Sequence, residues 1–355
     1  MKLNKQKNKF KRVDSLKSLS KIILKGGNIM AVDIITMGEM LIDFVPLKKG
    51  LPLKENEGFL RMPGGAPANV AVGVSKLGCK SAFFGKVGKD PFGRLLIDTL
   101  VDNKVETNAI IQTEEAKTSL AFVTLDETGD RDFTFYRDPG ADMLYKWDDV
   151  DLELFNKARI FHHGSISLIN EPVRTTTLKM AQKAREEGIL VSYDPNLRMP
   201  LWPNEEEAKR WIITGLETAN ILKLSEEELE FITGEKDIIT GMQKINEYDI
   251  DLVFVTLGAE GSYYYNGFSG EVVSGYKVDV QDTTGAGDAF VAGILSQLIQ
   301  RNLNNSDDFS NLSKLDLKEI VSFANAVGAL TTRGKGAISS LPNIDDVKAL
   351  IENIK

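Results

Sequence analysis

The sequence predicts an α/β fold in which a mostly parallel sheet is covered by helices and a small β-sheet lid is inserted into the sheet domain. Short apolar runs of strand length alternate with longer patterns of helical spacing, which is typical of parallel sheets. The 355 residues, 42% hydrophobic and 26% charged, suffice for one large core and a smaller appendage. Two stretches, 43–63 and 106–137, break the alternation, and we expect them to form the lid.

The expected elements follow one another in regular order along residues 30–355, which we assign to one domain. Predicted strands of the large sheet are the apolar runs at 32–37, 81–85, 159–163, 189–193, 220–224 and 252–257. Predicted helices lie at 67–77, 91–103, 171–187, 205–218, 225–232, 238–247, 288–301, 316–331 and 344–353. Pro67 near the start of the first helix and Gly78 just beyond its end support those boundaries.

The lid stretch 106–137 contains SLAFVTLDETGDRDFTFY, in which apolar residues alternate on both sides of ETGD. Alternation with a period of two predicts strands, and the polar, glycine-containing ETGD predicts the turn of a hairpin. We therefore expect a lid that is inserted into the sheet domain and not appended to it.

Composition excludes several classes of protein. The net charge is −8, and because residues 1–30 carry eight Lys, one Arg and one acidic residue, the remainder carries about −16. We expect no nucleic-acid partner for so acidic a body. The single cysteine, Cys79, allows no internal disulfide, which favours a reducing compartment. No apolar run approaches the roughly 20 residues that cross a bilayer, so we expect no membrane partner and a cytoplasmic location.

Residues 1–29 form a basic N-terminal extension that we expect to be disordered or not native. KGGNIM at 25–30 matches the translation of a ribosome-binding site followed by a start codon, since Lys-Gly-Gly can be encoded AAA-GGA-GGA. We hypothesise that Met30 is the native start, with a disordered basic tail as the alternative; a targeting segment is disfavoured because transit peptides favour Arg over Lys. Absence of a purine-rich site before codon 30 in the DNA would contradict the hypothesis.

The stretch from Asp282 to Asp288, DTTGAGD, is the most informative part of the chain. The small residues at 285–287 let backbone amides approach a ligand closely, and the apolar helical spacing that follows indicates that these amides open a helix. Unpaired amides at the positive end of a helix dipole suit a phosphate. Asp288 alone would be a helix-start carboxylate, but beside a phosphate cradle it suits the task of accepting the proton of an attacking hydroxyl.

Further motifs occur in a consistent order: GEMLIDF at 38–44, GGAPANVAVGVSKLG at 64–78, GKVGKDPFG at 85–93, FYRDPGADM at 135–143, DPNLRMPLW at 194–202, KLSEEELEFITG at 223–234, VTLGAEG at 255–261 and FANAVGAL at 323–330. With DTTGAGD, they make the chain from residue 30 onward resemble the ribokinase-like (PfkB) carbohydrate kinases, and within them the fructokinases. The resemblance implies a three-layer α/β sandwich with a small β lid, and a homodimer formed through the lid.

The resemblance also implies roles for individual residues. Asp288 is implied as the general base, and Gly285, Ala286 and Gly287 as donors of the amides that bind the transferred phosphoryl group. The sugar site is implied at Asp43, Gly64, Gly65, Asn69, Phe135, Arg137, Asp194, Asn196 and Arg198. Some of these residues have simpler alternatives: Asp43 as a turn aspartate, the glycines as a turn, and Phe135 as a core-filling aromatic side chain.

On the nucleotide side, the resemblance places Lys223 and Glu226 at the family's N-x-x-E motif, where Glu226 acts through water and Mg²⁺ and Lys223 replaces the Asn. Lys223 then has two interpretations, a phosphate contact or a surface charge. Thr256, Gly258, Gly261 and Asn325 match positions that meet ATP. Asp282, Thr284, Gly336 and Ser340 match a monovalent cation loop, which suggests K⁺, although an Asp before two Thr residues also suits a hydrogen-bond acceptor that stiffens the loop.

Other motifs are absent from the sequence. It has no GxxxxGK[ST] phosphate-binding loop and no GxGxxG after its first strand. Its only histidines, His162 and His163, are adjacent on a predicted strand, where side chains point to opposite faces, which disfavours a two-histidine metal site.

The predicted activity is transfer of the γ-phosphate of MgATP to O6 of D-fructose. The alternatives are a kinase for 2-keto-3-deoxygluconate or a related keto-sugar, because fold alone does not determine the substrate, and a non-catalytic sugar or nucleotide sensor. An intact Asp288 disfavours the sensor, since a protein that only binds has no need for a base there.

Overall fold

The computed structural model describes residues 32–48, 50–51, 53–125 and 131–353. The predictions for residues 1–29 and for the ETGD turn lie outside these residues. Among the described helices, none is long and apolar enough to span a membrane.

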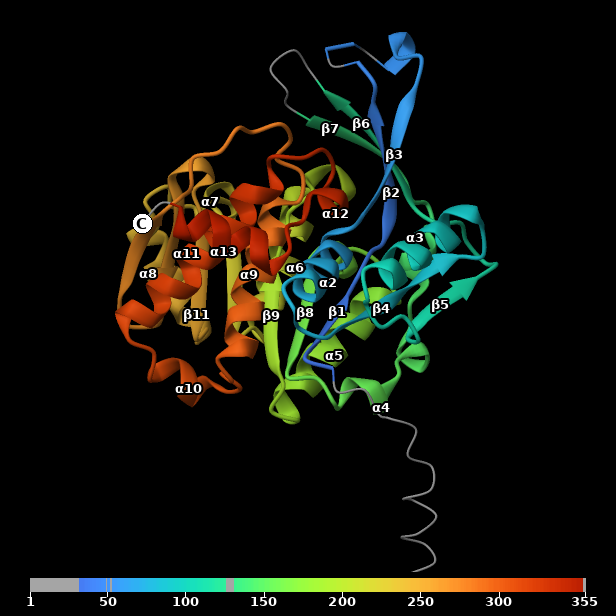
Figure 1. Cartoon of the computed structure of the whole chain (residues 1–355). Helices are drawn as coiled ribbons and strands as arrows, with labels where there is room; N and C mark the ends of the chain where they lie inside the picture. The colour runs from blue at the N-terminus through green and yellow to red at the C-terminus, as the bar shows by residue number, and fades with distance from the viewer. Residues whose placement is uncertain (1–31, 49, 52, 126–130, 354–355) are drawn as a thin grey trace, which may run out of the picture. The chain divides into compact units, whose positions relative to one another are not determined.

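The predicted α/β fold is confirmed: the described residues form a nine-stranded sheet in the order β13-β12-β11-β10-β9-β8-β1-β4-β5 (Figure 1). Its strands are β1 (Ile34–Met37), β4 (Ser81–Gly88), β5 (Ile110–Thr113), β8 (Ile160–Gly164), β9 (Leu190–Asp194), β10 (Ile221–Ser225), β11 (Leu252–Thr256), β12 (Gly261–Tyr265) and β13 (Gly270–Ser274). Neighbouring strands from β11 to β5 are parallel, whereas β12 and β13 pair antiparallel at one edge. The carboxyl ends of the parallel strands therefore lie along one edge of the large sheet.

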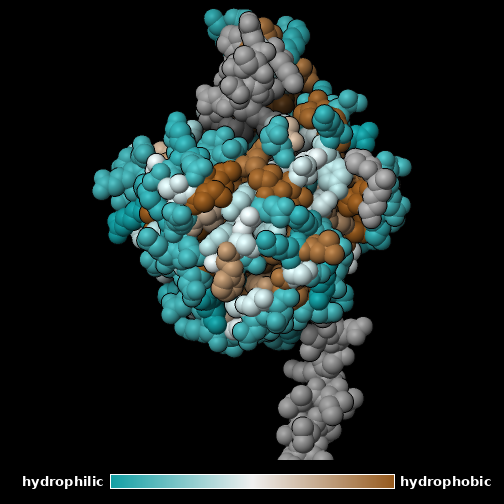
Figure 2. All heavy atoms as spheres, turned by 90° about the vertical axis from the view of Figure 1, so that its left-hand side faces the viewer, coloured by the Kyte–Doolittle hydropathy of each residue, from teal (hydrophilic) through white to brown (hydrophobic). Residues whose placement is uncertain are grey.

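Helices cover both faces of this sheet. One face packs against α2 (Ala66–Lys76), α3 (Pro91–Asp102), α9 (Ala286–Gln300), α10 (Ser306–Ser310), α11 (Lys314–Thr331), α12 (Ala337–Ser340) and α13 (Ile344–Glu352). The other face packs against α4 (Leu152–Phe155), α5 (Val173–Glu186), α6 (Glu205–Leu216), α7 (Glu226–Thr233) and α8 (Ile238–Ile245). The outer surface seen in Figure 2 is mostly hydrophilic, with apolar residues gathered in its upper half.

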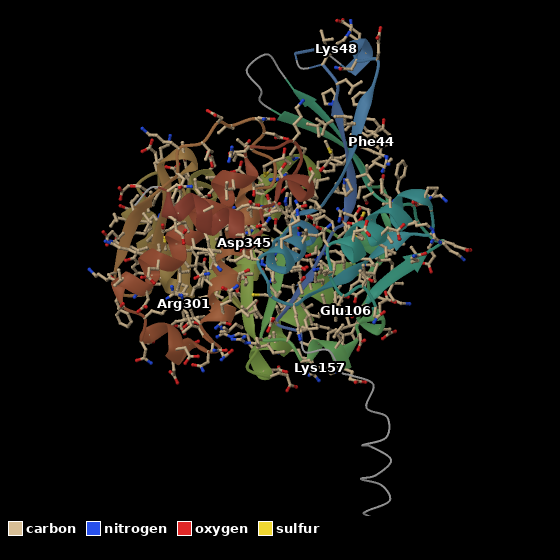
Figure 3. The ribbon with its side chains drawn as sticks, viewed as in Figure 1. Phe44, Lys48, Glu106, Lys157, Arg301 and Asp345 are labelled. Atoms are coloured by element: carbon tan, nitrogen blue, oxygen red, sulfur yellow. The ribbon has the colours of Figure 1, made fainter. Side chains whose placement is uncertain are left out.

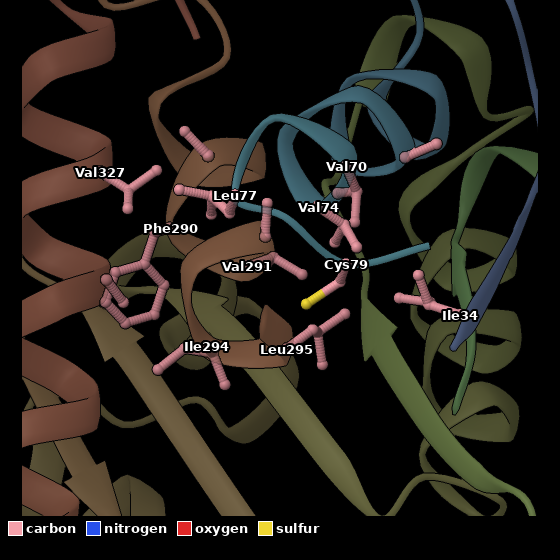
Figure 4. Packing of buried hydrophobic residues seen from close by; sticks show 14 of the residues in the cluster. Ile34, Val70, Val74, Leu77, Cys79, Phe290, Val291, Ile294, Leu295 and Val327 are labelled. Atoms are coloured by element: carbon pink, nitrogen blue, oxygen red, sulfur yellow. The ribbon is translucent and has the colours of Figure 1, made fainter. Parts of the chain in front are cut away.

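Helices α2 and α9 pack directly against each other on one face of the large sheet. Val70 and Val74 of α2 point toward Val291 and Leu295 of α9 in one buried cluster (Figure 4). Gly73 allows this approach, because a Cβ there would lie 2.6 Å from the Cβ of Ala292. The first turns of the two helices are thereby held close together above the sheet.

The small sheet has the order β3-β2-β6-β7, formed by β2 (Leu41–Pro46), β3 (Phe59–Gly64), β6 (Leu120–Leu125) and β7 (Arg131–Tyr136). It extends beyond the large sheet, with Phe44 in its middle and Lys48 near its tip (Figure 3). β6 and β7 pair antiparallel, as the alternation predicted. The stretch 106–137 is not all lid, however, because β5 pairs with β4 and extends the large sheet.

Candidate active site

The carboxyl ends of the parallel strands, the first turns of α2 and α9, and one face of the small sheet meet around a pocket of about 310 Å³. Many residues that line the pocket were predicted from the sequence: Asp43, Gly65, Asn69, Phe135, Asn196, Arg198, Lys223, Thr256, Thr284, Gly285, Gly287 and Asp288. The lining residues that were not predicted are Glu39, Leu41, Ala66, Ile166 and Thr283. Residues more than 200 positions apart thus share one pocket.

Helix α9 begins at the pocket with an unusual turn. Gly285, its N-cap, has φ 77°, and a Cβ there would lie 2.5 Å from the Cβ of Ala337, so only glycine fits. The helix start has no capping side chain. The N–H groups of Gly285 and Gly287 donate to no other described residue, whereas the N–H of Ala286 donates to the carbonyl of Thr283 at 3.2 Å. Ala286 therefore does not offer the free amide that the sequence predicted, while its two glycine neighbours do.

Asp288 lies in the first turn of α9, 7% exposed. Its Oδ2 accepts a hydrogen bond from Nδ2 of Asn69 at 2.7 Å, and its Oδ1 accepts one from Nδ2 of Asn196 at 3.2 Å. Burial raises the pKa of Asp288, against the opposing effects of the Asn69 hydrogen bond and the charges of Lys223 and Arg198. A buried carboxylate of raised basicity, held by two side-chain amides in a pocket, can take a proton from a bound alcohol.

Lys223 is buried beside Asp288 and belongs to a charged cluster. Its Nζ lies 3.2 Å from Oδ1 of Asp194 and 3.9 Å from Oε2 of Glu228. A Cβ on Gly287 would lie 3.2 Å from the same Nζ, so the ammonium group lies against Gly287 at the start of α9. Burial lowers the pKa of Lys223, but the surrounding carboxylates of Asp194, Glu228 and Asp288 outweigh it and raise the pKa. The interpretation of Lys223 as a surface charge is therefore wrong.

The structure does not bring Glu226 to this cluster. Glu226 is exposed on the first turn of α7 and does not line the pocket, whereas Glu228 is buried two positions later. Glu228 accepts hydrogen bonds from the N–H groups of Leu197 at 2.7 Å and Ser225 at 2.8 Å. The signal that identifies it was present in the sequence: Ser225-x-x-Glu228 is a capping box, which turns the Glu back toward the strand end.

Asp194 ends β9 and contacts the pocket only through its neighbours. Its Oδ1 accepts hydrogen bonds from Nζ of Lys223 and from the N–H of Asn196 at 3.2 Å. Burial raises the pKa of Asp194, and the nearby carboxylates of Glu228 and Asp288 add to this effect against Lys223. Asp194 thus supports Lys223 and the loop of Asn196, and does not line the predicted sugar site.

On the sugar side, the turn between β3 and α2 is shaped by close contacts. Gly65 has φ 110°, and a Cβ there would lie 2.4 Å from the carbonyl oxygen of Glu39; a Cβ on Gly64 would lie 2.6 Å from Oδ2 of Asp43. Gly64 itself does not line the pocket. Oδ1 of Asn69 is buried and has no hydrogen-bond partner among the described residues, so it can accept a hydrogen bond from a ligand hydroxyl.

Arg137 does not reach the pocket either. Its Nε and Nη2 donate to Oδ2 of Asp142 at 2.7 and 2.6 Å, and its side chain is almost fully buried. It lines a neighbouring pocket of about 510 Å³ whose wall includes Phe135, which borders both pockets. Among the described residues, Arg137 is therefore a buried ion-pair partner and not a free arm on the lid.

The remaining nucleotide-side residues lie around the turn after β11. Thr256 lines the pocket, and Gly258 and Gly261 have φ 56° and 109° in the turn that leads to β12. Asn325 accepts a hydrogen bond from Oγ of Ser262 at 2.8 Å and donates one to the carbonyl of Val273 at 2.9 Å. It thus joins α11 to β12 and β13, and its predicted place near adenine stays a prediction.

The predicted cation loop is held together by Asp282. Its Oδ1 accepts hydrogen bonds from Oγ1 of Thr284 at 2.6 Å and from the N–H of Thr284 at 3.0 Å, and its Oδ2 accepts one from the N–H of Gly336 at 2.9 Å. Asp282 therefore stiffens the loop, as the alternative interpretation proposed, and also joins the two segments assigned to the cation. Ser340 borders a separate surface pocket. Across the described ranges no cluster of three or more His, Cys, Asp or Glu side chains is suited to a metal ion.

The two histidines lie on opposite sides of the large sheet. Nδ1 of His162 is 3.0 Å from Oγ of Ser192, whereas the ring of His163 stacks on Tyr193 at 4.8 Å. Burial lowers the pKa of His162 to about 3 and that of His163 to about 4, so both rings are neutral at physiological pH. These neutral rings, each buried on its own side of the sheet, are part of the packed core.

Comparisons with known proteins agree with this geometry. The model of the pfkB family carbohydrate kinases matches residues 32–344. The chain is 49% identical to the probable fructokinase-6, chloroplastic, of Arabidopsis thaliana, over 90% of this chain and 83% of that protein. It is 48% identical to fructokinase-1 of Zea mays, over 90% of this chain and 97% of that protein.

Solved structures give the same result. A fructokinase of Xylella fastidiosa with bound ATP is 36% identical, with a TM-score of 0.84, covering 92% of this chain and 99% of that one. A Vibrio cholerae fructokinase double mutant with fructose, ADP and potassium ion bound is 38% identical, with a TM-score of 0.80, covering 90% of this chain and 98% of that one. With a family match over most of its length and an acid beside free amides at a helix start, the chain belongs to the pfkB family of carbohydrate kinases, as a sugar kinase that transfers a phosphoryl group.

Proposed function

We propose that this sugar kinase is a fructokinase, which transfers the γ-phosphate of ATP to O6 of D-fructose with Asp288 as the general base. The observation that carries the proposal is the arrangement at the start of α9, where the buried carboxylate of Asp288 and the free N–H groups of Gly285 and Gly287 border one pocket. A hydroxyl between them would meet a proton acceptor on one side and a phosphoryl group on the other.

We assign the roles of the pocket residues from the charges that they carry. Asp288 takes the hydroxyl proton, while the amides of Gly285 and Gly287 and the ammonium group of Lys223 stabilise the negative charge of the transferred group. Asn69 and Asn196 hold the carboxylate of Asp288 in place. Glu228 is held by Lys223 and by two backbone N–H groups, so the exposed Glu226 at the start of α7 stays the residue that we propose to act through water on the Mg²⁺ of MgATP.

Fructose is proposed as the acceptor because relatives named fructokinase cover nearly the whole chain and one solved relative has fructose bound. The rivals remain a kinase for 2-keto-3-deoxygluconate or a related keto-sugar and a non-catalytic sensor. A screen of ATP consumption with fructose, ribose, 2-keto-3-deoxygluconate, tagatose and adenosine tests all three. We expect the highest kcat/KM with fructose; a low rank for fructose contradicts the substrate, and no turnover with any acceptor supports the sensor.

We further propose a K⁺ requirement, because Asp282 joins the 282–284 loop to Gly336 and so brings together both segments that the resemblance assigns to a cation. Since both carboxylate oxygens of Asp282 already accept hydrogen bonds, K⁺ would be held through neighbouring oxygens of these segments. Replacing K⁺ by tetramethylammonium should lower kcat severalfold, and Asp282→Ala should abolish the difference. Equal rates in both salts contradict the proposal.

A homodimer through the small sheet is proposed from its exposed apolar residues. Tyr136 is 62% exposed and packs on Phe122 with ring centroids 5.4 Å apart. It lies on the face opposite Asp43 and Phe135, since side chains alternate along the paired strands. Tyr136→Lys should convert a dimer into a monomer in sedimentation-velocity experiments. Phe268→Lys, at an 86% exposed residue far from the small sheet in the chain, is the control and should leave the dimer intact.

The proposed location is the cytoplasm, on the ground of the single, buried Cys79. One similar protein is named chloroplastic, so cell fractionation with an antibody to the native protein is the test. Recovery with an organelle fraction contradicts the proposal.

A further inference from the structure

The hairpin of β6 and β7 extends beyond the large sheet (Figure 1) and joins the rest of the protein through two short connections. Ser119 directly precedes β6 and is 1% exposed, and Arg137 directly follows β7 and is 8% exposed. Two residues further along each strand, Asp43 of β2 and Phe135 of β7 flank Ala121 of β6 in the register of the small sheet. Asp43 and Phe135 both line the pocket, so the base of the hairpin adjoins its substrate-facing residues.

Asp142 contacts both connections directly. Its Oδ2 accepts hydrogen bonds from Nε and Nη2 of Arg137 at 2.7 and 2.6 Å, and its Oδ1 accepts one from the hydroxyl of Ser119. The carboxylate that makes these contacts is 3% exposed. Two N–H donors from one guanidinium define the direction of the Arg side chain as well as its distance from the carboxylate. Both ends of the hairpin are thus held by one buried side chain.

Asp142 itself belongs to a segment that is attached to the large sheet and its helices. It lies in the single-turn helix η2 (Ala141–Leu144), whose last carbonyl accepts a hydrogen bond from Nζ of Lys86 of β4 at 2.9 Å. The next residue, Tyr145, is 1% exposed, and its carbonyl accepts a hydrogen bond from Oγ1 of Thr176 of α5 at 3.3 Å. The contacts of Asp142 therefore connect the hairpin to a strand and a helix of the main layers.

Gly140 shows how closely these groups are packed. A Cβ on Gly140 would lie 2.7 Å from Oδ1 of Asp142, 2.8 Å from Cγ of Arg137, and closer still to Oγ of Ser119. Real Cβ atoms do not approach other heavy atoms so closely, so the space beside the carboxylate is full. The base of the hairpin is held by packing as well as by hydrogen bonds, which leaves it little freedom to shift.

We propose that Asp142 is a positioning residue for the sugar: by binding Ser119 and Arg137 it fixes both ends of the β6–β7 hairpin and thereby sets Phe135 over the pocket. This inference rests on the proposed sugar site. Asp288 stands on α9, outside the hairpin, so loss of the Asp142 contacts should weaken sugar binding and spare the chemical step. A direct contact between Arg137 and the sugar is the competing explanation, and it assigns no role to Asp142.

The first test is a double-mutant cycle with Arg137→Met, Asp142→Leu and the double variant, assayed with ATP and the sugar that ranks first in the screen. We expect each of the three to raise the sugar KM about tenfold, with kcat and the KM for ATP within about twofold of wild type. The double variant should be no worse than either single one, because the pair acts as a unit. Its Tm should exceed that of Asp142→Leu, since it leaves no buried charge without a partner.

The matched control is Asp33→Asn. Asp33 precedes β1 and lies 3.7 Å from Nη1 of Arg159, which precedes β8, at the opposite edge of the large sheet from the pocket. It should match wild type in the sugar KM. An unchanged sugar KM in Asp142→Leu overturns the inference, as does a double variant with wild-type sugar KM. Equal losses in kcat and both KM values also overturn it, since they indicate general loss of structure. A different preferred sugar contradicts only the proposed substrate.

A second readout does not depend on turnover. By hydrogen-exchange mass spectrometry, the backbone amides of β6 and β7 should exchange at least about tenfold faster in Asp142→Leu, while those of β11 stay unchanged. Ser119→Ala keeps the ion pair and removes only the contact to β6, so it tests the inference even if Asp142→Leu does not fold. We expect it to raise the sugar KM about threefold and to speed exchange in β6. Wild-type exchange in the hairpin of both variants overturns the inference.

Discussion

Replacing Asp288 by Asn should lower kcat by about 100- to 10,000-fold, the usual effect of removing a general base. The amide has nearly the same shape as the carboxylate but cannot take a proton. Because Asn69 and Asn196 donate hydrogen bonds to Asp288, the variant keeps an oxygen acceptor for one of them. We therefore expect the dissociation constants for sugar and ATP, measured by isothermal titration calorimetry, to change by less than about tenfold.

The pH profile separates the base from a helix cap. Since burial raises the pKa of Asp288, the fraction of active carboxylate, and with it kcat, should fall as the pH is lowered through that pKa. Asp288→Asn should lack this acidic limb. Asp345→Asn is the control, because Asp345 also lies in a first helical turn, that of α13, but on the surface (Figure 3). Near-normal turnover in Asp288→Asn would falsify the assignment of the base.

Replacing Lys223 by Met should reduce both stability and turnover. It leaves Asp194, Glu228 and Asp288 in one buried site without their cation, and breaking such an ion pair typically costs about 3–5 kcal/mol of unfolding free energy. It also removes the positive charge beside Gly287 at the start of α9, for which we expect a loss in kcat of about 100- to 1,000-fold. Urea unfolding and steady-state kinetics measure the two effects.

The Lys223→Met substitution should change the pH dependence of both kcat and the unfolding free energy in a defined direction. Without Lys223, the pKa values of Asp194 and Asp288 rise, so the acidic limb of kcat should move to higher pH. Destabilisation should be largest at neutral pH and should shrink as the carboxyl groups take up protons in acid. Lys318→Met, which removes an exposed ion pair with Glu271, should change the unfolding free energy by less than about 1 kcal/mol. A similar small effect for Lys223→Met would contradict a buried cationic role.

Local pattern predicted most of the large sheet because burial on both faces leaves a parallel strand almost wholly apolar. The predicted strand at 252–257, which the structure has as Leu252–Thr256, is of this kind. Edge strands lack that signature. Ile110–Thr113 is short and partly exposed, so the sequence did not distinguish it from the lid, and β12 and β13 were not predicted at all.

Within the site, sequence succeeded where a residue's role depends on its immediate neighbours. The small residues from Gly285 to Gly287 and the acid that follows predict a helix start with free amides, and the structure leaves two of those amides free. The sequence was less successful in predicting side chains whose partners come from other segments of the chain. Arg137 was predicted to close over the substrate, but in the structure it forms an ion pair with Asp142, five residues later. Glu39 was not singled out from the sequence, although it lines the pocket and accepts a hydrogen bond from the N–H of Ala66, 27 residues away.

By itself, then, the sequence determined the α/β class, most of its helices and parallel strands, the helix start that carries Asp288, and the family, because each of these is recorded in short stretches of pattern and spacing. The tertiary structure decided which acids stand beside Lys223, which amides remain free, and that Asp142 holds Arg137 away from the pocket. Those features depend on burial and on distances between distant segments, and a carboxylate's basicity is set by the charges and solvent that folding places around it.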